Sequence, residues 1–202
     1  RQCCSFFYAV FYKKTIQYRM KFLTYYLLLL TYLSASTLNL SMSSSLSRLN
    51  PILANDSASS EISDWLFNGL FKYDKNGNPT VELAKSYNFE TPTKLIIKLR
   101  EDVLWHDNIK LTSKDIIFTY EKIIDPKVFN SIKSNFQEVQ SVKALDDYTI
   151  EVIYKNPYFK ALETWMVGIL PYHLLKDDKD LMTSSFNKNP IGTGSYKLKE
   201  FK

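Results

Sequence analysis

His106 and Asp107 are the residues of this 202-residue chain that most resemble catalytic machinery, because a histidine beside a carboxylate can serve as a general base. Adjacency alone does not pair them, since neighbouring side chains along an extended backbone point apart. A serine hydrolase would also present its nucleophile on a strained turn, and the sequence contains no Gly-x-Ser-x-Gly motif. We therefore predict no catalytic residue and interpret this stretch as a polar turn that orients Trp105 into the core. An exported hydrolase using His106 stays open as the alternative.

His173 is the second histidine, and the two histidines do not form a pair at helical spacing. Zinc sites of exported hydrolases use such pairs, as in His-Glu-x-x-His, so we predict no metal site and no cofactor. Gly192-Thr193-Gly194 resembles a phosphate-binding loop, but a strand pattern follows it where a helix N-terminus would be needed to face an anion. We interpret this glycine motif as a flexible junction between two lobes.

The basic residues are concentrated at the start of the chain. The formal net charge is +5, with 26 basic and 21 acidic residues, and five of the basic residues lie before Thr37, where there is no acidic residue. Removing those five leaves 21 basic residues, equal to the 21 acidic ones. No basic run with interleaved aromatic residues remains to follow a phosphate backbone, so we exclude nucleic acid as a partner.

Residues 20–36 have the three parts of a secretory signal peptide. Met20 and Lys21 precede a short apolar run, and small residues follow it, so we expect cleavage after Ser36. The apolar run is shorter than the roughly 20 residues that span a bilayer. These features predict an exported, periplasmic protein. A membrane-tethered structural protein is the alternative if the mature N-terminus begins before Thr37.

Residues 1–19 precede the expected start at Met20, so we interpret them as an upstream or non-native extension. Cys3 and Cys4, the two cysteines of the sequence, fall in this extension. On this interpretation the exported protein has no thiol for a disulfide or a metal. Thr37 to Ser43 alternates apolar and small polar residues and predicts the first strand of the mature protein.

Two helices are predicted on either side of the Trp105 turn. The first begins at Asp56 or Ser57 as N-cap, and Gly69 can end it in a left-handed conformation. The second is expected to begin at Thr112, which forms a capping box with Asp115, and to end at Asp125-Pro126. Its expected buried stripe comprises Ile116, Ile117, Tyr120, Ile123 and Ile124.

Strand patterns lie between and beyond these helices. Residues 70–73, 94–100 and 148–154 are predicted as strands, the last two with clear alternation. Residues 157–166 are predicted as a helix with Pro157 at its first position, and residues 195–201 as a final strand. Strands outnumber β-helix-β crossovers, so we predict an α/β fold with mixed sheets and exclude a parallel-only sheet.

The order of several short motifs resembles the extracytoplasmic oligopeptide, dipeptide and nickel solute-binding proteins of ABC importers. These motifs are Leu49-Asn50-Pro51, the stretch from Asp56 to Glu61, Leu66-Phe67-Asn68-Gly69-Leu70, Leu83-Ala84-Lys85-Ser86, the stretch from Leu99 to Asp107, and the stretch from Gly192 to Leu198. The resemblance covers the chain from Thr37 to its end. Asn108 replaces the glycine usual after Trp-His-Asp, and asparagine also tolerates a left-handed turn.

The resemblance implies a two-lobed clamp of the type-II periplasmic-binding-protein class that delivers a ligand to a membrane permease. Residues 37–202 would form its first lobe alone, with about 70–188 as an inserted subdomain, and we expect a truncated fragment that is monomeric. A single lobe should bind ligand weakly, because closure buries a ligand between two lobes. The resemblance places the ligand-binding segment at Ala54, Asn55, Asp56 and Ser57, with a peptide as the expected ligand and nickel or another small solute as the alternative.

Overall fold

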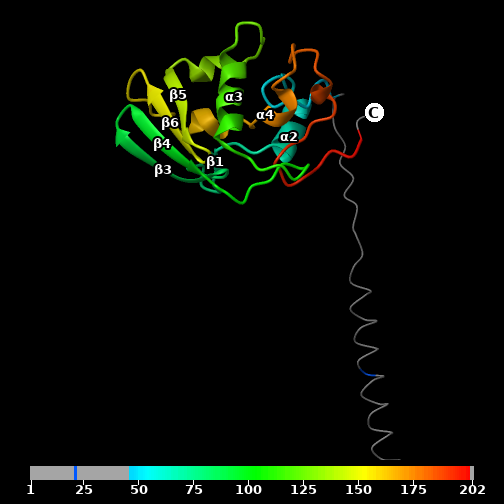
Figure 1. Ribbon diagram of the computed structural model, residues 1–202, viewed down its shortest axis with the longest axis horizontal. Coiled ribbons are helices and arrows are strands. Elements are labelled where there is room, and N and C mark those ends of the chain that lie inside the picture. Colours follow the sequence, from blue (N-terminus) through cyan, green and yellow to red (C-terminus); the bar gives the residue numbers. More distant parts are fainter. Residues whose placement is uncertain (1–20, 22–45, 201–202) are drawn as a thin grey trace, which may run out of the picture. The chain divides into compact units, whose positions relative to one another are not determined.

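The computed structural model describes Lys21 and residues 46–200, and Figure 1 shows the fold of residues 46–200. The predictions for the extension at 1–19, the signal peptide at 20–36 and the strand at 37–43 lie outside the described residues, Lys21 excepted. The same holds for Cys3 and Cys4. Among the described residues, no helix combines the length and the apolar character needed to cross a membrane.

A four-stranded antiparallel sheet forms one side of the described fold (Figure 1), with the strand order β3-β4-β6-β5. Its strands are β3 (Ala84–Thr91), β4 (Lys94–Leu99), β5 (Val139–Asp146) and β6 (Thr149–Tyr154). A separate antiparallel pair is made by β1 (Phe71–Tyr73) and β2 (Pro79–Val81). All strand pairings among the described residues are antiparallel, which confirms that their sheets are not parallel-only.

The alternating strands of the sequence are the central strands of this sheet. Leu95, Ile97 and Leu99 are buried on β4, and β6 likewise buries every second residue. The sequence analysis missed β3, although Tyr87 and Phe89 alternate with polar residues in this edge strand. Every residue of β3 after Ala84 is exposed, so this alternation does not mark a buried face.

Helix α2 (Ser57–Leu66) begins as predicted, with Asp56 as its N-cap. It ends before Phe67, whose backbone is extended, so the prediction that Gly69 ends the helix in a left-handed conformation is wrong. Gly69 has a different role. A Cβ at Gly69 would lie 2.7 Å from the backbone of Met166, so this position needs a glycine because two backbone segments approach closely.

Helix α3 (Ser113–Ile124) confirms the predicted capping box and the predicted stop at Asp125. The Asp115 carboxylate accepts a hydrogen bond from the backbone N–H of Thr112, with an N–O distance of 2.8 Å. Ile116 and Ile123 are buried as expected, whereas Ile124 is exposed. Thr119 is also buried, and its hydroxyl accepts the backbone N–H of Leu170 at 2.8 Å. This hydrogen bond joins α3 to the backbone at Leu170.

The last third of the chain is less regular than predicted. The predicted helix at 157–166 is confirmed only as η2 (Glu163–Met166), a short 3-10 helix. The predicted final strand is absent from residues 195–200, because the N–H groups of Gly194 and Tyr196 donate to the carbonyls of Leu66 and Trp65 at the end of α2. The remaining short helices are η1 (Ile132–Phe136), α4 (Tyr172–Leu175) and η3 (Ser185–Asn187).

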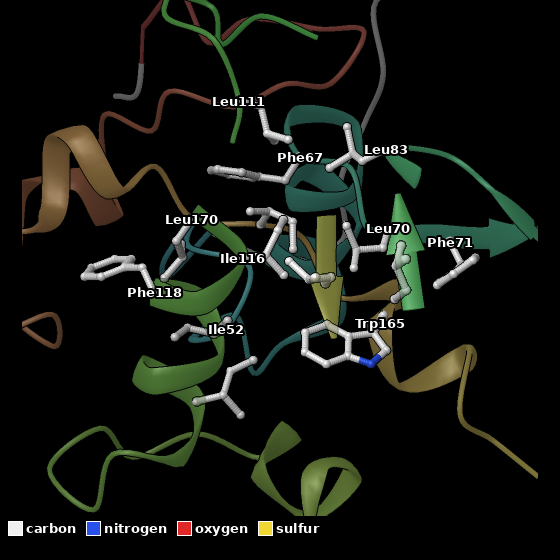
Figure 2. Close-up of a cluster of buried hydrophobic side chains, with 14 of the residues drawn as sticks. Ile52, Phe67, Leu70, Phe71, Leu83, Leu111, Ile116, Phe118, Trp165 and Leu170 are labelled. Atoms are coloured by element: carbon white, nitrogen blue, oxygen red, sulfur yellow. The ribbon is translucent and has the colours of Figure 1, made fainter. Parts of the chain in front are cut away.

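One hydrophobic cluster joins these elements, and Figure 2 shows part of it. Ile116 and Phe118 of α3 and Trp165 of η2 belong to this cluster, and so does Phe67, which directly follows α2. Trp165 is 1% exposed, and its indole N–H donates to the Tyr154 hydroxyl at 3.1 Å. The core therefore lies between the sheet and the helices and fixes α2 relative to η2.

Candidate ligand-binding site

The Trp105 turn has the structural character that the sequence indicated. Trp105 is 1% exposed, and its carbonyl accepts the N–H of Asn108 at 2.8 Å. Asn108 has φ of +70°, the left-handed conformation in which asparagine can replace glycine. The turn thus buries its tryptophan and closes on its own backbone.

His106 and Asp107 point to different partners. The His106 ring lies 2.9 Å from the Gly194 carbonyl through Nε2 and 3.2 Å from the Gly192 N–H through Nδ1. Because the Gly192 N–H donates to Nδ1, the ring proton lies on Nε2 and is donated to the Gly194 carbonyl. Both ring nitrogens of His106 are therefore engaged with the backbone, which leaves neither one for proton transfer in this geometry.

Asp107 instead pairs with His173, which the sequence analysis did not connect to it. His173 Nε2 lies 2.8 Å from Asp107 Oδ2, and both side chains are partly buried. Burial by itself would raise the pKa of Asp107. The hydrogen bond from His173 and its charge outweigh this effect and hold the pKa of Asp107 below its usual value. No local signal could reveal this pair, because 66 positions separate the two residues.

The Gly192-Thr193-Gly194 motif packs against the C-terminal end of α2. The Gly194 N–H donates to the Leu66 carbonyl at 2.8 Å, and a Cβ at Gly192 would lie 1.8 Å from that same carbonyl oxygen. The Thr193 hydroxyl donates to the Asn68 side chain at 3.1 Å. These glycines are thus explained by a close approach of two backbones rather than by the flexibility that we expected.

The predicted ligand segment lies at the N-terminal end of α2. Ala54 and Asp56 are half-buried, whereas Asn55 and Ser57 are exposed. The N–H groups of Leu53 and Ala54 both donate to the Asn50 carbonyl at 2.9 Å. The fully buried Asn50 side chain in turn donates to Asn187 at 3.0 Å. The segment is therefore held on a turn with a buried anchor.

Asp56 has a structural task within this segment. Its carboxylate accepts the Ser47 hydroxyl and the Ser59 backbone N–H, the latter at 2.8 Å. These hydrogen bonds, that of Ser47 first and those of Ser59 next, lower the pKa of Asp56 to about 2. A carboxylate that caps a helix in this way stabilises the fold.

The backbone of the segment remains available for bonding. The N–H groups of Asn55 and Ser57 have no acceptor among the described residues, whereas that of Asp56 faces its own carboxylate. Asp56 is extended, with φ of −106° and ψ of 152°. The Asn55 side chain accepts the Ser131 hydroxyl at 3.4 Å, so the loop after α3 lies beside the segment. This arrangement can pair with an extended chain through its main-chain groups.

A cavity of about 250 Å³ opens beside Ala54, and we call it the α2 cavity. Its walls come from α2, from η1 and from η2 with the residues that follow it. Ser60, Ser63 and Asp64 line it from α2, at the i, i+3 and i+4 spacing that places side chains on one helix face. The sequence analysis did not select these residues, although that polar spacing was readable.

Comparison with known proteins places the described fold among periplasmic binding proteins. NikZ from Campylobacter jejuni, solved with Ni(L-His), matches with a TM-score of 0.72 and 36% identity over 79% of this chain and 32% of that one. AppA from Bacillus subtilis, solved with a nonapeptide, also matches with a TM-score of 0.72, at 30% identity over 78% of this chain and 32% of that one.

The family model for the middle part of bacterial extracellular solute-binding proteins, family 5, matches residues 78–202, and the chain belongs to this family. The sequence of oligopeptide-binding protein AppA from Bacillus subtilis is 32% identical over 163 residues, which are 76% of this chain and 29% of AppA. The periplasmic oligopeptide-binding protein OppA from Salmonella typhimurium is 26% identical over 70% of this chain and 30% of its own length.

The chain thus spans about a third of the length of these relatives. The relatives are solute-binding proteins rather than enzymes, and family members are extracytoplasmic. The resemblance to solute-binding proteins and the mixed α/β fold class are therefore confirmed.

Proposed function

We propose that this chain is a solute-binding component of an ABC importer, which captures peptides in the periplasm and delivers them to a membrane permease. On this proposal it is a monomer without enzymatic activity, residues 20–36 direct its export, and residues 37–202 form a first lobe with a subdomain at about 70–188. The relatives AppA and OppA, both named for oligopeptide binding, support the peptide as ligand.

The observation that carries this proposal is the open backbone of Asn55 and Ser57. Their N–H groups have no acceptor among the described residues, and they flank Asp56, whose backbone is extended just before α2 begins. Main-chain hydrogen bonds give affinity for a peptide of any sequence, and pockets beside them add selectivity. The segment predicted from the resemblance therefore has the chemistry that peptide capture requires.

A proline substitution at Ser57 tests the backbone role without breaking the helix. Ser57 is the first residue of α2, a position where proline is tolerated because its N–H has no helical partner. The preceding Asp56 is already extended, as a residue before proline prefers. Ser57→Pro removes one N–H donor, and Ser57→Ala removes the hydroxyl but keeps that donor.

We expect amide NMR titration of the chain with a mixed di- to pentapeptide library to show weak binding centred on Asn55 to Ser57. Ser57→Pro should weaken it about fivefold, the value of roughly 1 kcal/mol for one hydrogen bond, and Ser57→Ala should not. Absence of peptide-induced shifts in this segment, or equal affinity of the two variants, would contradict the proposal. Micromolar binding would contradict the expectation that one lobe binds weakly.

A nickel complex is the second candidate ligand, favoured by the 36% identity with NikZ, which was solved with Ni(L-His). Among the described residues, no three His, Cys, Asp or Glu side chains are grouped so that they could hold a metal ion. Titration with Ni(L-His) in place of the peptides separates the candidates. Saturable shifts with the nickel complex and none with peptides would favour the nickel function.

A further inference from the structure

The α2 cavity contains a buried polar atom that nothing in the described structure satisfies. Ser63 is 2% exposed, and its Oγ has no hydrogen-bond partner. A buried hydroxyl without a partner costs about 1 to 3 kcal/mol, so such groups normally face a partner of some kind. Ser63 lines the α2 cavity, which places its oxygen where a bound group could meet it.

Two carboxylates share the cavity with Ser63, and no basic residue lines it. Asp64 comes from α2 and Glu163 from η2, and neither forms a salt bridge with a described Lys, Arg or His. The other hydroxyls of the wall already donate to backbone carbonyls. Thr164 donates to Lys160 at 3.0 Å and Ser60 to Ala54 at 3.4 Å, so their remaining lone pairs are acceptors.

Apart from Asn135, the rest of the wall is apolar, and the space is large enough for an organic group. Ile132 and Phe136 line it from η1, and Met166 and Val167 from the other side. Its volume of about 250 Å³ far exceeds the roughly 10 to 15 Å³ that one water molecule requires. An apolar wall with acceptors and negative charge matches a short alkyl chain that ends in a cation.

Asp64 has negatively charged neighbours outside the cavity wall, Glu61 and Glu82, of which Glu82 also pairs with Lys72 at 3.2 Å. Displacement of water by the surrounding protein raises the pKa of this carboxyl, and the negative charges of Glu82 and Glu61 add to the effect. A cation bound beside Asp64 would offset each of these contributions. Its presence would therefore lower the pKa that burial raises.

We propose that the α2 cavity is a subsite for an alkylammonium group, such as the end of a lysine side chain, which donates to Ser63 Oγ and to the carboxylates of Asp64 and Glu163. The proposal rests on the proposed function, because it makes the cavity a specificity pocket beside the segment at Ala54. The cavity borders Ala54, so a peptide paired with that segment can place one side chain in it.

n-Butylammonium tests the subsite without any peptide, with n-butanol as the uncharged probe of similar size. We expect saturable amide shifts at Ser63, Asp64 and Thr164 with butylammonium at constant ionic strength, and none with butanol. Glu163→Gln should weaken binding about tenfold, as loss of a charge-assisted hydrogen bond does, and Ser63→Ala about fivefold. Glu101→Gln is the matched control, because Glu101 is exposed and does not line the cavity.

The proposal is overturned if butanol binds as well as butylammonium, if no saturable shift is seen, or if Glu163→Gln leaves the affinity unchanged. It is also overturned if the cavity holds bound water only.

The circular dichroism spectrum and the thermal midpoint of each variant show whether it is folded. Ala-Lys-Ala should bind more tightly than its norleucine analogue. If butylammonium binds but no peptide does, the peptide function fails and the cavity site stands; if peptides shift Asn55 to Ser57 but butylammonium does not bind, only the subsite fails.

Discussion

The Trp105 turn and the segment from Ala54 to Ser57 both present polar residues on loops, yet the structure uses them in opposite ways. In the turn, both ring nitrogens of His106 bond to the backbone of Gly192 and Gly194. In the segment, the N–H groups of Asn55 and Ser57 have no acceptor among the described residues. The first region uses its polar atoms to join distant parts of the chain, and the second leaves two backbone donors open, which is why we propose it as the ligand segment.

This difference shows why residue type is a poor guide to function by itself. A histidine beside an aspartate suggests chemistry, but a ring whose nitrogens are both engaged acts as a structural cross-link. An asparagine and a serine suggest an ordinary loop, but backbone groups without partners are the kind that can pair with another chain, and this is the basis of the site proposed at Asn55 and Ser57. The two regions differ in whether their polar atoms already have hydrogen-bond partners within the fold.

The largest loss of stability is expected from Gly192→Ala, which places a methyl group where the Gly192 backbone packs against the end of α2. The new Cβ would lie 1.8 Å from the Leu66 carbonyl oxygen, and a backbone atom cannot move aside cheaply. We expect the free energy of unfolding to fall by about 3 kcal/mol in urea denaturation. Gly77→Ala is the control, since its Cβ meets open space and its φ of +80° should cost only about 1 kcal/mol. Equal losses would refute the close approach.

His106→Ala should cost less, and in stability rather than in ligand binding. The variant leaves the Gly194 carbonyl and the Gly192 N–H without their ring partners. We expect about 1 to 3 kcal/mol of destabilisation in the same denaturation experiment, with unchanged peptide shifts at Asn55 to Ser57. A hydrolytic activity that disappears in this variant while its fold is kept would favour the hydrolase alternative.

Asp56→Asn should change how stability depends on pH. The folded-state pKa of Asp56 is about 2 against the usual 3.8, so its charged form is favoured in the folded protein. That stabilisation is fully present above pH 3.8 and is lost as the pH falls toward about 2. Thermal melts across this window should show a shallower loss for Asp56→Asn than for the wild type. Identical slopes would mean that Asp56 does not cap the helix as a carboxylate.

Asn55→Ala should have the smallest effect on stability. Its one described side-chain contact is the 3.4 Å hydrogen bond from Ser131, at the surface. We expect a change within about 0.5 kcal/mol in urea denaturation, because exposed substitutions away from caps and cores are close to neutral. The peptide shifts should persist, since the backbone N–H is kept. A loss above 1 kcal/mol would show that the segment depends on Asn55 for its structure.

Sequence patterns predicted the elements whose reasons are local. The alternation of β4 and β6, the N-cap at Asp56 and the Thr112–Asp115 capping box were confirmed because each depends on residues within a few positions. The edge strand β3 was not predicted, although Tyr87 and Phe89 alternate with polar residues, and its residues after Ala84 are exposed. The final strand was wrong because Gly194 and Tyr196 bond to the end of α2, a partner that no local pattern discloses.

By itself, the sequence determined the starts of α2 and α3, the strands β4 and β6, and the class of solute-binding proteins that the chain resembles. The segment at Asn55 stays a prediction. Only the tertiary structure decided which polar groups remain open. The His106 ring bonds to the Gly194 carbonyl, 88 positions away in the sequence. Ser63 and Glu163 come together only because both line the α2 cavity. Hydrogen bonds are satisfied in three dimensions, so the unsatisfied ones, which a ligand needs, can be identified only after the chain has folded.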